Sequence, residues 1–253
     1  MRKKSFLLSL GTLLALVSCS VQASLNPTVC AVPQVYAALE ASKTETPQYY
    51  KTFYAPLEDL ESRISNNEGP CDIVISSEEK FGVLMLRANK TEMNFIQPFV
   101  KAPLILWSAD ENLFKDNIKV ITKKKLKSIA IPIAKLSPVG FAASQITKKK
   151  EFPTDYLKHR LYRTEHEYQT YAMVSSGNVQ VGFLTKPLIM DKGNKTGSYW
   201  AIDRSYYEPI NYYIIKNAKS INAQTLKVYE YLKSSPKALT HFYNTGFESL
   251  ETH

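Results

Sequence analysis

Two cysteines carry the best-defined chemistry in this sequence of 253 residues. Cys30 and Cys71 each fall inside a short, strand-like apolar segment, TVCAV and CDIVIS. In an oxidising compartment two such thiols can pair as a disulfide, whereas in a reducing one they stay buried and separate. The sequence alone leaves both alternatives open.

The other side chains that could do chemistry form no recognisable constellation. The histidines lie far apart and show no H-x-x-x-H spacing, at His159, His166, His241 and His253. We therefore expect no metal site. Paired tyrosines would suit ferric iron, but tyrosines in strands more often pack or line a rim. The sequence has no G-x-S-x-G, P-loop or G-x-G-x-x-G motif, so we expect neither catalysis nor a cofactor.

Residues 1–23 have the layout of a secretory signal peptide. MRKK is basic, SFLLSLGTLLALV is apolar, and small residues follow. The apolar part is too short to span a bilayer as a permanent anchor. We therefore expect export, with the periplasm as the destination.

Two cleavage patterns are present. Cleavage after Ala23 would begin the mature chain at Ser24, while the residues leading to Cys19 resemble a lipobox that would make Cys19 a lipidated N-terminus. We favour cleavage after Ala23, because a strand-like segment begins at Thr28 and a lipoprotein usually carries a longer tether. Lipidation of Cys19 remains the alternative.

The chain is basic, with a net charge of +9 that falls to +6 when Arg2, Lys3 and Lys4 leave with the signal. Much of the rest is in two lysine runs, residues 123–125 and 148–150. Neither run is interleaved with arginine or aromatic residues. We therefore expect solvated turns or helix ends, and no nucleic-acid partner.

Hydrophobic residues make up 44% and charged residues 22% of the chain, as in ordinary globular proteins. In the first third, strand-like and helical segments alternate. We expect strands at 28–32, 49–54 and 71–76, and helices at 34–42, 56–67 and 78–89. Strands separated by helices pair in parallel through right-handed crossovers.

The pattern changes after residue 100. We expect strands at 101–109, 128–132, 179–186 and 207–216, and helices at 137–149, 164–178 and within 223–247. Ser137 and Pro138 fit the cap and first position of a helix. Thr164 and Glu167 have the T-x-x-E spacing of a capping box. The whole predicts two α/β lobes with a cleft between them, joined by the long strands at 101–109 and 207–216.

Six segments, in this order, resemble periplasmic molybdate-binding proteins, the substrate-binding components of ABC importers. They are GPCDIVISSEEKF, PLILWSAD, SIAIPIAKLSPVGFAASQ, VSSGNVQVGFLTK, YEPINYYIIK and YEYLKSSPKALTHFYNTGF. The last is the most specific match. Together they cover roughly residues 26–247.

The resemblance implies a type II periplasmic binding protein fold, in which each lobe is a mixed, mostly parallel sheet flanked by helices. We expect one lobe from residues 24–103 and 213–253, and the other from residues 104–212. The implied function is capture of a small ligand in the interlobe cleft, by a monomer that serves an inner-membrane ABC permease. The alternative is an exported scaffold or interaction protein of the same fold that has lost the ligand site.

The family binds an oxyanion with hydroxyl and N–H groups at helix starts, which suit anions in general. Carried over by position, its first hydroxyl-bearing loop falls on residues 31–34, with Val32 and Pro33 as the expected ligand positions. The second falls on residues 54–57, with Ala55 and Pro56 as the expected ligand positions. Both loops lack serine here and contain proline, which has no N–H to donate.

The remaining ligand positions fall in the second lobe. The resemblance places them at the helix start around Ser137 and Val139, at Glu167, and at Thr185, where the family has a tyrosine. Glu167 either brings a carboxylate to the oxyanion position, or folds back onto its own helix as a capping-box residue. These departures leave two ligand classes open: an oxyanion such as molybdate or tungstate, or another small solute, organic or cationic.

Overall fold

The computed structural model describes residues 26–45, 49–115, 126–150, 152–191, 194–220 and 222–250. The expected signal peptide, Cys19 and the lysine run at 123–125 lie outside these residues. Within them, every helix is too short or too polar to cross a membrane.

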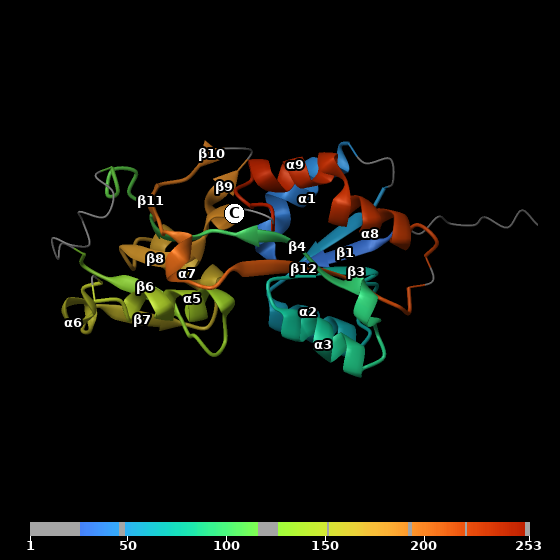
Figure 1. Ribbon diagram of the computed structural model, residues 1–253, viewed down its shortest axis with the longest axis horizontal. Coiled ribbons are helices and arrows are strands. Elements are labelled where there is room, and N and C mark those ends of the chain that lie inside the picture. Colours follow the sequence, from blue (N-terminus) through green and yellow to red (C-terminus); the bar gives the residue numbers. More distant parts are fainter. Residues whose placement is uncertain are drawn as a thin grey trace, which may run out of the picture.

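Two five-stranded sheets form two lobes that lie side by side (Figure 1). We call the first sheet and its helices lobe 1. Its strand order is β2 (Lys51–Tyr54), β1 (Thr28–Ala31), β3 (Ile73–Ser76), β12 (Ile210–Lys216) and β4 (Ile96–Ala102). β1 pairs in parallel with β2 and β3, as expected, while β12 runs antiparallel to β3 and β4.

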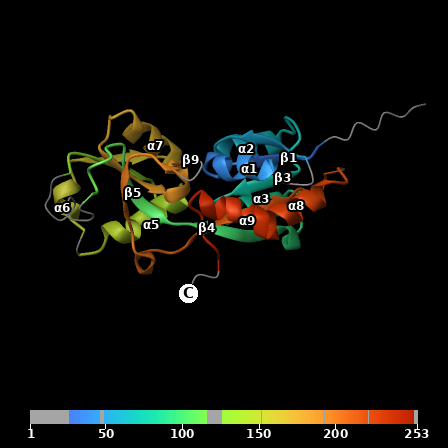
Figure 2. The ribbon, with the colours of Figure 1, turned by 90° about the horizontal axis from the view of Figure 1, so that it is seen from above.

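Helices cover both faces of this sheet (Figures 1 and 2). In Figure 1, α2 (Leu57–Ser65) and α3 (Glu79–Arg87) lie below it, and α1 (Tyr36–Lys43), α8 (Thr225–Ser234) and α9 (Pro236–Asn244) lie above. Two 3₁₀ turns, η1 (Pro33–Val35) and η2 (Met93–Phe95), complete the lobe. Since both faces are covered, β1 and β3 are buried along their whole length, as their apolar runs predict.

The second sheet and its helices form lobe 2. Its strand order is β11 (Ser198–Ala201), β5 (Leu104–Ser108), β8 (Val181–Thr185), β6 (Ile129–Pro132) and β7 (Leu161–Thr164). Its helices are α5 (Pro138–Thr147), α6 (Thr154–Leu157) and α7 (Glu167–Ser175). The 3₁₀ turns η3 (Lys186–Ile189) and η4 (Arg204–Tyr206) and the pair β9 (Met190–Asp191) and β10 (Asn194–Lys195) lie beyond β8.

Alternation along β5 explains how α5 and α7 share the second sheet. Leu104 and Leu106 join the cluster that contains buried residues of α5, whereas Ile105 and Trp107 join the cluster that contains Val174 of α7. Successive side chains of a strand point to opposite faces. A continuous apolar strand therefore supports one helix on each face.

Two chain crossings connect the lobes. The single strand expected at 101–109 is wrong: β4 ends at Ala102 and pairs in lobe 1, while β5 begins at Leu104 and pairs in lobe 2. Proline at position 103 cannot donate to a ladder, so the strand divides there. The second crossing runs from β11 to β12, and the Leu104 N–H donates to the Tyr207 hydroxyl at 2.9 Å, which ties the two crossings together.

β12 returns the chain to lobe 1. All seven of its residues lie in the first sheet, with Ile210 opposite Ala102 and a register shift between Tyr212 and Tyr213. The expected division between residues 212 and 213 therefore coincides with this irregularity inside β12. We retain the lobe limits of 24–103, 213–253 and 104–212 as a proposal.

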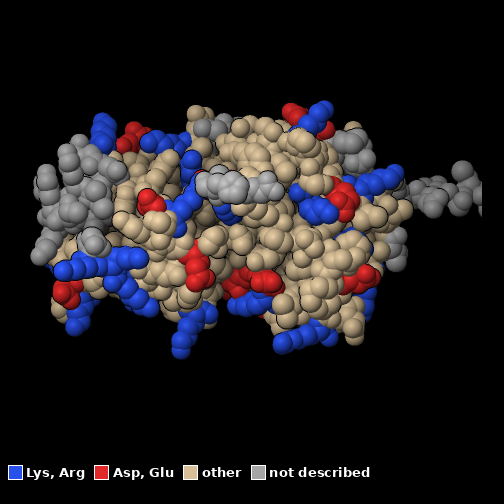
Figure 3. Space-filling model, viewed as in Figure 1, with Lys and Arg blue, Asp and Glu red and all other residues tan. Residues whose placement is uncertain are grey.

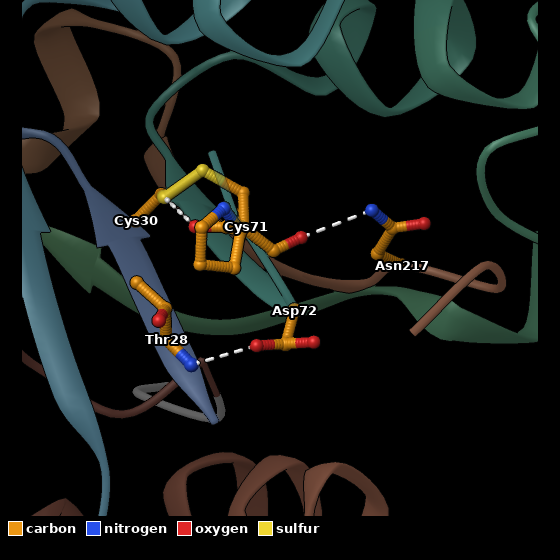
Figure 4. Close-up of a disulfide and its surroundings, with 6 residues drawn as sticks. Thr28, Cys30, Cys71, Asp72 and Asn217 are labelled. Carbon is orange, nitrogen blue, oxygen red and sulfur yellow. Dashed lines mark hydrogen bonds between the residues drawn. A yellow bond between two sulfur atoms is a disulfide. The ribbon is translucent and has the colours of Figure 1, made fainter. Parts of the chain in front are cut away.

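A disulfide joins Cys30 of β1 to Cys71, just before β3 (Figure 4). The two Cα atoms are 5.5 Å apart and both residues are buried. Beside it, the Thr28 N–H donates to the Asp72 carboxylate at 2.8 Å, and the Asn217 side-chain amide donates to the Cys71 carbonyl at 3.0 Å. The crosslink and these bonds fasten the start of β3 to its neighbours at the end of lobe 1 where β1 begins.

Candidate functional site

A cleft between the lobes has two connected parts. The inner cavity, of about 40 Å³, is lined by residues of both lobes. The outer cleft, of about 320 Å³, shares residues 77–78 and 136–138 with it. The outer volume is within the range of small-molecule sites, whereas the inner cavity has room for only a few water molecules.

Lobe 1 contributes the segments that follow its parallel strands. Val32 and Pro33 lead from β1 into η1, and Pro56 precedes α2 after β2. Because parallel strands present their carboxyl ends at one edge of the sheet, these segments meet there. The Pro56 position has no side-chain cap bond among the described residues, so the first N–H groups of α2 are left without a side-chain acceptor at the cavity edge.

Lobe 2 contributes the starts of α5 and α7. Ser137 caps α5, and its hydroxyl accepts from the Gly140 N–H at 3.4 Å. The start of α7 differs from the expected capping box, which is wrong: the helix is capped by His166, whose Nδ1 accepts from the Gln169 N–H at 3.2 Å. Thr164 instead ends β7. Glu167 is thus the first helical residue, where its side chain need not fold back.

The Glu167 carboxylate is held by three donors. Its Oε2 accepts from the Thr185 N–H and from the Thr185 hydroxyl, each at 2.8 Å. Its Oε1 accepts from the side-chain amide of Gln34 in lobe 1 at 2.7 Å. Glu167 is only 3% exposed, yet lines the inner cavity. This single side chain therefore bridges the lobes.

Burial dominates the electrostatics around Glu167. It raises the pKa of Glu167 above the ordinary value of 4.5, and the hydrogen bonds from Thr185 and Gln34 oppose that shift. Burial and the nearby Glu167 charge both raise the pKa of Tyr212 well above 10.0. The Tyr212 hydroxyl lies close enough to Thr185 and Glu167 to interact with both, but has no well-formed hydrogen bond among the described residues.

This raised pKa predicts how stability depends on pH. The folded protein holds the Glu167 proton at pH values where the unfolded chain has released it. Its free energy of unfolding therefore falls as pH rises from about 4.5 through the folded-state pKa. Urea unfolding of wild type and Glu167→Gln across this window should show the wild type losing stability relative to the variant. The raised pKa of Glu167 would be contradicted by a stability difference between wild type and Glu167→Gln that does not change with pH. It would also be contradicted if wild type lost stability in the same way relative to Glu165→Gln, which removes an exposed carboxylate.

The structure brings five of the eight expected site residues to the inner cavity. These are Val32, Pro33, Pro56, Ser137 and Glu167. Thr185 lies behind Glu167 as its donor. Ala55 and Val139 are buried and do not line the cavity, and the Ala55 N–H is engaged by the Ala31 carbonyl at 3.2 Å.

Tyr212 is a residue of the site that the sequence pattern does not predict. Gln34 is the last residue of the expected first loop, residues 31–34, but the resemblance gives no role to its side chain. Its amide oxygen is buried and has no partner among the described residues. Tyr212 lies in β12, and the apolar pattern of this strand does not show that the Tyr212 hydroxyl lies beside Glu167.

Charged side chains of both signs surround the outer cleft. Lys80 pairs with Glu78 at 2.6 Å, and Glu79 and Lys135 line the same space. Red and blue side chains accordingly lie together at the junction of the lobes in Figure 3. Within the described part of the chain, no three His, Cys, Asp or Glu side chains are grouped to hold a metal ion. The lining therefore suits a polar molecule with charges of its own.

Comparisons with known proteins agree with this architecture. The family described as bacterial extracellular solute-binding protein matches residues 30–248. The molybdate-binding protein ModA of Azotobacter vinelandii is 26% identical over 189 residues, which are 74% of each chain.

Solved structures share the fold. The periplasmic molybdate-binding protein of Azotobacter vinelandii superposes with a TM-score of 0.74 at 21% identity, covering 87% of this chain and 98% of that one. PEB3 with L-phospholactate bound gives a TM-score of 0.70 at 13% identity, covering 88% and 99%. The two lobes around a cleft are thus the architecture of a type II binding protein.

Proposed function

We propose, since the chain belongs to the family of bacterial extracellular solute-binding proteins, that it is the exported binding component of an ABC-type importer. Its ligand is a small solute held in the interlobe cleft, and its partner is an inner-membrane permease. The signal-like residues 1–23 support a periplasmic location. The proposal involves transport without catalysis.

One observation carries the choice of ligand: the cleft is lined by carboxylates from both lobes. Glu167 and Glu58 line the inner cavity, and Glu78 lines both parts. A second negative charge about 4 Å from a carboxylate costs roughly 4 kcal/mol near a protein surface. A divalent oxyanion such as molybdate or tungstate is therefore disfavoured.

A small polar organic solute fits the cleft better. The outer cleft is larger than a single oxyanion requires, and Lys80 and Lys135 offer positive charge beside Glu78 and Glu79. The L-phospholactate in PEB3 supports the view that this fold accommodates an organic ligand. We infer a solute with at least one cationic or hydrogen-bond-donating group.

The proposal predicts a rise in melting temperature with a solute of this class. A screen would use amino acids, diamines, quaternary amines and organic phosphates, with molybdate, tungstate, sulfate and phosphate as a separate arm. A ligand at 100 times its Kd stabilises by about 2.7 kcal/mol, which is about 5 °C or more for a protein of this size.

Two matched variants test whether the solute binds in the cleft. Leu136 is 48% exposed and lines both parts of the cleft, so Leu136→Trp should abolish the rise. Leu226, 50% exposed on α8, gives the control Leu226→Trp, which should keep it. If no compound in either arm changes the melting temperature, a scaffold without a ligand site is the better account.

A further inference from the structure

The Glu167 carboxylate is bound in the way that proteins bind a free anion. It accepts three hydrogen bonds, one from a backbone N–H, one from a hydroxyl and one from an amide. The donors come from both lobes and converge on one buried point. A carboxylate with several such donors is strongly oriented.

Helix starts add to this environment. Glu167 is the first residue of α7, which has nine residues, and its carboxylate lies at the positive end of its own helix. The starts of α2 and α5, of nine and ten residues, line the same cavity through Pro56 and Ser137. The chain thus brings a carboxylate of its own to a cavity where three helices begin.

A second observation concerns the hydroxyl of Tyr212, which makes no well-formed hydrogen bond among the described residues. Tyr212 is 0% exposed, and its hydroxyl has no hydrogen-bond partner among the described residues. It lies beside Thr185 and Glu167. A buried hydroxyl without a partner is costly. The Tyr212 hydroxyl is therefore a fourth donor at this site, beside the three that already donate to Glu167.

We propose that Glu167 determines specificity by filling an anion site with its own carboxylate. In the wild type this carboxylate occupies the Thr185 and Gln34 donors, and its charge repels a second anion. When the carboxylate is removed, the same donors, with the Tyr212 hydroxyl, form a vacant site for a tetrahedral oxyanion. The inference rests on the proposed function only in taking the inner cavity as part of the ligand site.

The test is a calorimetric titration of wild type and Glu167→Ala with sodium tungstate and with sodium sulfate. Loss of the nearby charge should tighten oxyanion binding by at least about a hundredfold. We therefore expect saturable one-to-one binding by the variant and none by the wild type. Glu165→Ala is the matched control, because it removes an exposed carboxylate just before α7 and should behave as the wild type does.

A second variant covers the case in which Glu167→Ala does not fold. Glu167→Ser keeps a polar group at the helix start, but its side chain is too short to reach the Thr185 donors. The proposal is overturned if a folded variant binds neither oxyanion, or if the wild type binds them as tightly as the variants. The proposed function fails by a different result, the absence of any response of the wild type to the organic solutes.

Discussion

Replacing Cys30 and Cys71 together with serine lowers the free energy of unfolding by about 4 kcal/mol. The two residues are 41 apart in sequence, and the disulfide restricts the unfolded chain by closing a loop of that length. The chain-entropy relation gives about 4 kcal/mol for such a loop. For a protein of this size the melting temperature should fall by about 10 °C.

Guanidinium unfolding of the oxidised wild type, the reduced wild type and the double variant measures this effect. The reduced wild type is the control, because it keeps both cysteine side chains and loses only the crosslink. It should lose nearly as much stability as the double variant. A loss below about 1 kcal/mol in the reduced protein would show that the crosslink does not stabilise lobe 1 by this mechanism.

Replacing Gly140 with valine costs about 3 kcal/mol and also disturbs the cleft. Gly140 lies in the first turn of α5, where the helix passes the end of β6. A Cβ at this position would lie 2.5 Å from the Pro132 carbonyl oxygen and 2.7 Å from that of Ile133. Both are backbone atoms, so α5 itself must shift, and overpacking of this kind costs about 1–3 kcal/mol.

The shift also displaces Ser137 and Pro138, which line both parts of the cleft. We expect Gly140→Val to lose the ligand-induced rise in melting temperature as well as stability. Ser144→Ala, on the same helix with an exposed hydroxyl, should change the free energy of unfolding by less than about 0.5 kcal/mol. A Gly140→Val protein as stable as the Ser144→Ala control would contradict the close packing.

The strong elements of the fold were predictable from their patterns. Apolar runs predict the strands β1, β3 and β8 close to where they lie, and the Ser137 cap with Pro138 predicts the start of the helix α5. Two edge strands, β7 and β11, were missed because LYRT and SYWA are short and mix polar with aromatic residues. The apolar pattern predicts one strand at 101–109, because an apolar run does not reveal that Pro103 separates two sheets.

The site was predictable only in part. Pro33, Pro56 and Glu167 line the inner cavity, because each follows a strand at the sheet edge, and their role as ligand residues stays a prediction. Gln34 and Glu167 are 133 positions apart, so their contact depends on how the lobes approach. The T-x-x-E spacing of Thr164 and Glu167 predicts a capping box, which is wrong. Local spacing cannot show that β7 extends to Thr164, so that His166 caps the helix instead.

The claim that Glu167 excludes an oxyanion from the cavity is tested most directly by a calorimetric titration of the wild-type protein with sodium molybdate. The chain is similar to molybdate-binding proteins, yet Glu167 holds its own carboxylate in the cavity between the lobes. We predict no saturable heat from the wild type, and saturable one-to-one binding by Glu167→Ala measured alongside it. Saturable micromolar binding of molybdate by the wild type would show that Glu167 does not exclude an oxyanion.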